Sequence, residues 1–243
     1  MLASIWPSKM RLPARLLLLA LFASLPAWAG GLRIEVVTTD FVMPAKITAI
    51  DAITGAEGVH VAQRVVGKGR ELPPSWPAGA DLIILDSPRP SDAEQILAAV
   101  RPALQAAQIP WVQVGGGPPV SGQLSPDHAR QIASYYGNGG ATNFLNLAIW
   151  LRKWSTGDPG LGSVPAAQVL PATGYYEGPG RTTSASQSDM EDVWRKAGQQ
   201  AWPRVAVLIA ANNVSSMQTQ VIDALIVEGE RKKVSVFGVW YPQ

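Results

Sequence analysis

The chain has 243 residues, and its 20 basic and 18 acidic side chains give a formal net charge of only +2. This near balance, without a basic patch, excludes the charge pattern of a nucleic-acid-binding protein. The absence of cysteine excludes disulfides, thiolate metal ligands and cysteine nucleophiles. The only histidines, His60 and His128, are too far apart in sequence to form a two-histidine metal motif.

The first 29 residues carry the three parts of a secretory signal peptide. Lys9, Arg11 and Arg15 precede an uncharged apolar run at 16–25, and residues 27–29 read Ala-Trp-Ala, a cleavage pattern. We expect cleavage there, leaving a periplasmic or secreted chain of 214 residues with a net charge of −1. An uncleaved anchor is the alternative, but the apolar run is about half as long as a membrane span requires. No later segment predicts a membrane span.

Strands and helices alternate over the next 85 residues or so. Ile47, Ile50 and Ile53 recur at helical spacing after Pro44, and Gly55 ends that pattern. Apolar or alternating segments predict strands at 32–38, 59–66, 80–85 and 110–114. This order indicates an α/β fold with an open, mostly parallel sheet and flanking helices.

The second helix of this region is predicted from Ser91 to Ala107. Ser91 is the expected N-cap, and Glu94 would complete a capping box. Apolar side chains at helical spacing would face the sheet. They are Ile96, Leu97, Val100 and Leu104.

Two features follow predicted buried strands, at the edge where ligands bind in open α/β sheets. Asp86 would either orient a ligand or metal, or cap the turn after its strand. The glycines at 115–117 would offer backbone amides to an anion. Pro118 and Pro119 remove two amide donors, however, and no Lys-Ser/Thr pair follows. A tight crossover loop is therefore the favoured interpretation.

Two helices are expected at 126–135 and 142–154, separated by a turn that contains three glycines at 137, 139 and 140. Tyr135 and Tyr136 lead into this turn, and Thr142 and Asn143 stand at the start of the second helix. Free amides at that start, with Asn143, would hold a polar ligand group. The alternative is an ordinary helix junction capped near Thr142. His128 is interpreted as a surface histidine at a helix start.

A second α/β unit is predicted after a segment rich in glycine and proline. It comprises a helix at 187–197, a buried strand at 204–210, a helix from Ser215 to Lys232 and a strand at 234–240. Val221, Leu225 and Ile226 would face inward. One strand-helix-strand unit is too small to stand alone, so either a C-terminal region is missing or the unit docks onto the first sheet.

The predicted organisation has four parts. They are a signal peptide at 1–29, an N-terminal α/β domain with a helical extension at 30–160, a crossover at 161–186 and the start of a truncated second unit at 187–243.

The order of several short motifs resembles the N-terminal part of the CobN/magnesium-chelatase H-subunit family. Tyr136, Gly139-Gly140 and Asn143 match an element that precedes a helix. Gly174-Tyr175-Tyr176 matches a G-x-Y motif. Three further matches follow along the chain. They are a strand at 203–209, a D-A-L-I helix at 223–226 and a strand at 234–237.

The chain departs from the family pattern at two places. Glu177 and Gly178 replace the usual His or Asp followed by Pro, and residues 210–212 (Ala-Ala-Asn) replace an aromatic-Arg ending. The family pattern is therefore not matched directly after the G-x-Y motif and directly after the next strand.

The resemblance implies a very large protein that inserts, removes or exchanges a metal in a tetrapyrrole. This chain would be its N-terminal fragment, not catalytic alone, in an exported CobN-like branch of cobaltochelatase or cobalamin-related proteins. The substrate would be a tetrapyrrole with cobalt, magnesium or iron. No resident cofactor or metal site is evident, and partners would be helper ATPase subunits or uptake-system proteins.

Ligand-binding residues are expected from the motifs and from the aromatic surface of Tyr135 and its neighbours, which would stack on a flat ring. They are Tyr136, Gly139, Gly140, Asn143, Tyr175, Tyr176, Glu177 and Asp86. The catalytic residues remain unknown. A stand-alone periplasmic small-solute-binding protein with two α/β lobes is the alternative, and its weakness is the incomplete second lobe.

Overall fold

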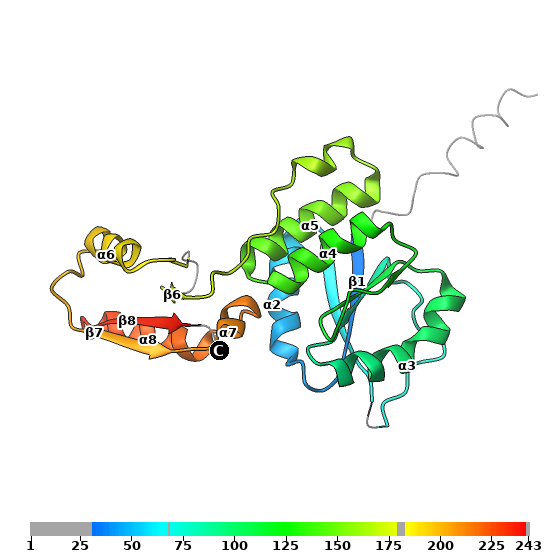
Figure 1. The fold of residues 1–243 in the computed structure, drawn as a ribbon, viewed down its shortest axis with the longest axis horizontal. Helices are drawn as coiled ribbons and strands as arrows, with labels where there is room; N and C mark the ends of the chain where they lie inside the picture. The colour runs from blue at the N-terminus through cyan, green and yellow to red at the C-terminus, as the bar shows by residue number, and fades with distance from the viewer. Residues whose placement is uncertain (1–30, 68, 179–182, 242–243) are drawn as a thin grey trace, which may run out of the picture. The chain divides into compact units, whose positions relative to one another are not determined.

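A computed structural model describes residues 31–67, 69–178 and 183–241. The predicted signal peptide lies outside these residues. The first sheet has five strands in the order β2-β1-β3-β4-β5. The strands are β1 (Leu32–Thr38), β2 (Val59–Val65), β3 (Leu82–Asp86), β4 (Trp111–Val114) and β5 (Ser121–Gly122). The first four pair in parallel and β5 is antiparallel, so the predicted α/β class with a mostly parallel sheet is confirmed (Figure 1).

Helices cover both faces of this sheet (Figure 1). They are α2 (Pro44–Thr54), α3 (Pro90–Ala107), α4 (Pro126–Asn138) and α5 (Ala141–Thr156), with short 3₁₀ turns η1 (Gly55–Glu57) and η2 (Pro159–Ser163). One core joins the sheet to α2, α4 and α5, and a second core joins its other face to α3. All five residues of β3 are buried, as its continuous apolar run predicts for a central parallel strand.

Helix α3 begins one residue before the predicted cap. Pro90 occupies the first helical position and Arg89 is the extended N-cap, so the prediction of Ser91 and Glu94 as a capping box is wrong. Proline is preorganised for the first helical turn and forces its predecessor into extended backbone. Asp92 takes the capping role, because its Oδ2 accepts from the Arg89 backbone N at 3.2 Å. Hydrogen bonds from the Arg89 guanidinium lower the pKa of the Asp92 carboxyl.

The turn between α4 and α5 is shorter than predicted. Helix α4 continues through Gly137 to Asn138, and only Gly139 and Gly140 separate it from α5. A helix tolerates one interior glycine at a cost of about 1 kcal/mol, which the buried face of α4 offsets. The two helices therefore form a tight hairpin over the sheet.

The second sheet has three strands in the order β6-β8-β7. They are β6 (Gly174–Tyr176), β7 (Arg204–Leu208) and β8 (Ser235–Trp240), accompanied by α6 (Gln187–Lys196), α7 (Ala211–Ser215) and α8 (Gln220–Arg231). Strand β7 is parallel to β8, whereas β6 is antiparallel to it. Strand β6 comes from the segment 161–186 that the sequence indicates as a crossover.

Two predictions about the second sheet are wrong. Strand β7 is mostly exposed instead of buried, because it is an edge strand that pairs only with β8. Ser215 ends α7 instead of capping a long helix, and α8 begins at Gln220. The apolar composition of β7 therefore does not predict whether its side chains are buried.

Helix α8 faces the sheet with a different stripe from the predicted one. Ile222 and Ile226 are buried, whereas Val221 is 79% exposed and Leu225 is 45% exposed. The inward stripe continues to Gly229, where an added Cβ would lie 2.8 Å from the Val234 carbonyl oxygen. This i, i+4, i+7 spacing places the glycine where the helix comes closest to β8.

None of the described helices combines the length and apolarity that crossing a bilayer requires.

We predict opposite outcomes for two neighbours on α8. Ile226→Ala removes a side chain that is 3% exposed and should lower the free energy of unfolding by about 2–5 kcal/mol. Leu225→Ala, the matched control at 45% exposure, should cost much less, because part of the side chain already contacts water. Urea unfolding measures both values. Equal losses would contradict the observed orientation of α8.

Candidate functional site

A cavity of about 490 Å³ lies where several of the predicted motifs meet. From the helical hairpin it is lined by residues 138–143, and from the following segment by residues 168–171. The remaining lining residues are Tyr176, Gly178, Thr183, Val214, Ser215, Met217 and Thr219. Of the predicted ligand-binding residues, the cavity brings together Gly139, Gly140, Asn143 and Tyr176.

The two glycines of the α4–α5 turn are required by backbone geometry. Gly139 has φ 63° and ψ −165°, and Gly140 has φ 81° and ψ 155°, conformations that side chains other than glycine rarely adopt. A Cβ on Gly139 would lie 2.0 Å from the carbonyl oxygen of Ser215. The Gly140 N–H donates to that same oxygen at 2.7 Å. The glycine pair thus lets the backbone near α7 contact the hairpin.

Asn143 fixes the segment that forms one wall of the cavity. Its Nδ2 donates to the carbonyl oxygens of Gly139 at 2.7 Å and Gln168 at 2.8 Å. Its Oδ1 accepts from the Gln168 backbone N at 2.8 Å. The side chain is buried and both ends of its amide are used. The structure therefore gives Asn143 a positioning role for the wall at 168–171.

Tyr176 joins two of the sequence motifs. Its hydroxyl donates to Asp223 Oδ1 at 2.7 Å, and the Thr219 hydroxyl donates to Asp223 Oδ2 at 2.9 Å. Burial, together with the nearby Asp223 carboxylate, raises the pKa of Tyr176 to about 12. Asp223 stands in the D-A-L-I match, but its pairing with Tyr176 is not visible in the sequence, since 47 residues separate them.

Tyr136 and Asp86 meet each other away from this cavity. The Tyr136 hydroxyl donates to Asp86 Oδ2 at 2.9 Å, and Lys46 Nζ lies 2.6 Å from the same oxygen. Burial, with the Asp86 carboxylate, holds the pKa of Tyr136 well above its usual range. Asp86 is the last residue of β3 and is buried. It is neither a turn cap nor an open ligand position, but ties α2 and α4 to the sheet.

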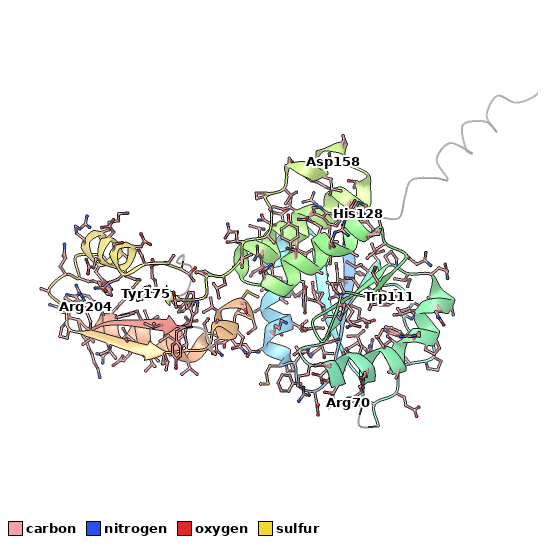
Figure 2. All side chains as sticks on the ribbon, in the orientation of Figure 1. Arg70, Trp111, His128, Asp158, Tyr175 and Arg204 are labelled. Carbon is pink, nitrogen blue, oxygen red and sulfur yellow. The ribbon has the colours of Figure 1, made fainter. Side chains whose placement is uncertain are left out.

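The predicted aromatic surface is not formed by all four tyrosines. Tyr135 is fully buried and Tyr136 is 3% exposed, both in the core under α4, so neither ring lies on the surface of the protein. The Tyr135 hydroxyl donates to the Pro165 carbonyl oxygen at 2.6 Å. Tyr175 is half-buried on the second sheet, where its ring lies 6.2 Å from that of Phe237 (Figure 2).

Glu177 does not line the cavity either. Its carboxylate is buried and accepts a hydrogen bond from the Ser184 hydroxyl. It faces the small space beside α6, where Trp194 and Phe237 pack. Glu177, at which the chain departs from the family pattern, therefore packs within the second α/β unit and not at the larger cavity.

The other two sequence features have structural explanations. Gly115, Gly116 and Gly117 all have positive φ, and a Cβ on Gly115 would lie 2.5 Å from the Ser87 carbonyl oxygen, as a tight crossover loop requires. His128 lies at the start of α4, edge-on to Trp150 at 5.4 Å. Within the described ranges, no three His, Asp or Glu side chains gather as a metal site would need.

The described lining of the cavity carries no charged side chain. Among the residues that the structure describes there, none is Asp, Glu, Lys, Arg or His. Val169, Leu170, Pro171, Val214 and Met217 supply apolar surface, and hydroxyl groups and the backbone at the start of α5 supply hydrogen-bonding groups. This lining suits an apolar organic molecule with a polar periphery, and it provides no side chain that would act as a proton-accepting base at neutral pH.

These observations define a class of α/β protein in which a helical hairpin with a double-glycine turn contacts helix α7 of a second, smaller α/β unit, beside a cavity whose described lining carries no charged side chain. Residues 133–243 match the family model described as CobN/Magnesium Chelatase, so this region of the chain is similar to that family. No curated protein matches the chain significantly in sequence.

One of the solved structures that match is similar at the level of fold. The structure described as "Catalytic Subunit of Cobaltochelatase from Mycobacterium tuberculosis" is 16% identical, with a TM-score of 0.54, over 87% of this chain and 16% of that chain. Two heterocyclases, one "in complex with substrate and Cofactor" and one named TruD, are each 13% identical, with TM-scores of 0.31 and 0.32. They cover 58% and 59% of this chain and 22% and 24% of those chains.

We predict that the two glycines of the turn differ in their sensitivity to substitution. Both Gly139→Ala and Gly140→Ala force alanine into positive φ, at about 1–3 kcal/mol each. Only Gly139→Ala also places a Cβ against Ser215, since nothing lies within 4 Å of a Cβ on Gly140. Gly139→Ala should therefore lower the free energy of unfolding further, as urea unfolding would show. Equal losses would mean that the Ser215 contact is unimportant.

Proposed function

We propose that this chain forms the tetrapyrrole-binding N-terminal region of an exported cobaltochelatase-like protein. The region would act in metal insertion, removal or exchange on the ring. The observation that carries the proposal is the position of the cavity. All of its lining residues, from 138 to 219, lie within the segment that matches the CobN/Magnesium Chelatase family.

The physical character of the cavity supports a ring ligand. A tetrapyrrole is flat and apolar at its faces, with polar groups at its rim. The cavity offers apolar side chains at 169–171, and its volume of about 490 Å³ falls within the range of about 300–1,000 Å³ of ligand pockets. Carboxylates at the rim would be stabilised by the free backbone amides at the start of α5.

The chemistry available in the cavity favours binding over catalysis by this chain alone. Chelation requires that pyrrole protons be removed, yet no carboxylate or imidazole lines the cavity. The Tyr176 hydroxyl stays protonated up to a pKa of about 12, so it serves as a hydrogen-bonding group. The metal, cobalt, magnesium or iron, would be substrate. Proton removal would fall to other parts of a longer protein, with helper ATPase subunits or uptake-system proteins as partners.

A stand-alone small-solute-binding protein would also need a cavity beside two α/β units. The match of residues 133–243 favours the chelatase-type proposal, because it covers the end of α4, all of α5 and the second sheet. No observation on the described residues favours the small-solute alternative specifically.

We predict saturable binding of a ring to this cavity. Titration of the chain with a metal-free dicarboxylate porphyrin, and separately with a corrinoid, should shift the absorbance bands of at least one of them. Val169→Arg should weaken that binding at least tenfold, because a bulky cation would fill the apolar mouth. Val169 is 74% exposed, so its replacement should leave the fold intact.

Val227→Arg is the matched control, since Val227 is 58% exposed on α8 and does not line the cavity. It should bind the ring as the parent chain does. The proposal fails if neither ring produces a saturable shift, or if the two arginine variants bind equally well.

The export part of the proposal predicts a processed N-terminus. The chain recovered from the periplasm of a bacterial host should begin at Gly30 by mass spectrometry, because cleavage follows Ala29. Ala29→Arg should block cleavage, whereas Trp28→Ala should not, since the middle position of the motif is unrestricted. An unprocessed chain that stays in the cytoplasm would contradict export.

A further inference from the structure

A second cavity, of about 270 Å³, lies over strands β1 and β2, on the face of the first sheet that carries α3. Arg33 pairs with His60 and Glu35 with Ala62 in the parallel register, and all four line this cavity with Arg64. The other face of β1 carries Leu32, Ile34 and Val36 in the main core. Because parallel sheets are normally apolar on both faces, charged side chains over β1 and β2 need a separate explanation.

A loop closes the opposite side of this second cavity. Its lining residues run from Pro73 to Ala80, and Trp76 is only 8% exposed. The Trp76 indole donates its Nε1–H to Glu35 Oε2, so the loop is fixed to the strand by a hydrogen bond. Pro73 and Trp76 give the cavity an apolar wall opposite the charged strands.

The acidic side chains of the cavity already have partners. Glu35 Oε1 accepts from Arg64 Nη2 at 2.6 Å and from Arg64 Nε at 3.0 Å, while Trp76 occupies Oε2. The Glu35 side chain is 14% exposed, so this pairing offsets its desolvation. Because of these hydrogen bonds, the Arg64 and Glu35 charges neutralise each other. The other acidic side chain, Asp51, accepts a hydrogen bond at Oδ1 from the Val61 backbone N at 2.8 Å.

Arg33 is left as the unpaired cation of the cavity lining. Its guanidinium forms no ion pair in the part of the chain that the structure describes. The Asp81 carboxylate accepts a hydrogen bond from the Arg33 backbone N at 2.8 Å and not from the guanidinium. Its Nη1 would lie 3.0 Å from a Cβ on Gly79, which places the guanidinium against the closing loop. A guanidinium in such a position presents its planar donors to a ligand.

We propose that this second cavity binds a small organic monocarboxylate. The carboxylate would pair with the Arg33 guanidinium through two parallel hydrogen bonds, and the apolar body would contact Trp76 and Pro73. The Asp51 carboxylate at the same cavity would repel additional negative charge, which favours a monoanion over phosphate or a polycarboxylate. No residue lines both cavities, so this site is independent of the ring-binding proposal.

Titration calorimetry with benzoate on the full chain tests the site. We expect saturable binding that weakens at least tenfold in Arg33→Gln and stays unchanged in Arg101→Gln, an exposed arginine on α3. Benzamide, the neutral isostere, should bind at least tenfold more weakly than benzoate. Arg33 is also exposed, so Arg33→Gln should keep the thermal unfolding midpoint of the parent chain.

A second readout locates the ligand. The indole N–H resonance that is lost in Trp76→Phe should shift when benzoate binds to the parent chain, because that N–H reaches Glu35 at the cavity wall. The proposal is overturned if benzoate does not bind, if Arg33→Gln or benzamide leaves the affinity unchanged, or if inorganic phosphate binds more tightly than benzoate. Benzoate binding without a shift of that resonance would also overturn it.

Discussion

The architecture of the candidate site depends on one close approach between backbones. The carbonyl oxygen of Ser215 lies where a Cβ of residue 139 would be, and it accepts a hydrogen bond from the next residue in the turn. Only two successive glycines permit this geometry, since both have positive φ and the first has no room for a side chain. The segment after β7 is thereby held against the α4–α5 hairpin, and the cavity exists beside that contact.

Two polar clusters then define the walls of the cavity. Asn143 uses its whole amide group to hold the backbone at Gln168, and Asp223 accepts from both Tyr176 and Thr219. The hydrogen-bonding groups of each cluster find their partners within the cluster. Satisfied, buried polar groups of this kind specify one arrangement of the chain, because breaking any of them leaves a costly unpaired group. The motifs thus build the walls, and the ligand would meet mostly apolar and hydroxyl surface.

Local patterns predicted much of the fold. The bounds of β1 and α2 agree with the prediction, because alternation and the Pro44 and Gly55 signals are all local. The inward face of α8 is only partly predictable. Ile226 is buried as predicted, but residues 221, 225 and 226 fit helical spacing as well as 222, 226 and 229 do. Only contact with β8 distinguishes the two stripes. The exposure of β7 was missed for a related reason, since an apolar strand at a sheet edge has the same composition as a central one.

The sequence predicts which segments form the site. It does not predict what each residue of those segments contacts. Gly139, Gly140, Asn143 and Tyr176 do come together, yet the partners that explain them, at 168, 215 and 223, are backbone atoms or distant side chains. Asp86 and Tyr136 pair with each other and with Lys46, which no local pattern marks. The Gly139-Gly140 and Asn143 motif before α5 is visible in the sequence. The partners of its hydrogen bonds, at Gln168 and Ser215, become visible only in the folded chain.

The distribution of charge separates the two cavities and limits what each would do. The described lining of the cavity beside the hairpin contains no ionisable acid or base that changes charge near neutral pH, so a ligand there would be held by shape, apolar contact and neutral hydrogen bonds. The cavity over β1 and β2 is built around arginines, one neutralised by Glu35 and one unpaired. Strong discrimination by charge is therefore available only in the second cavity. A flat ring with an uncharged centre suits the first, because burying a charge there would incur a desolvation penalty with no partner to offset it.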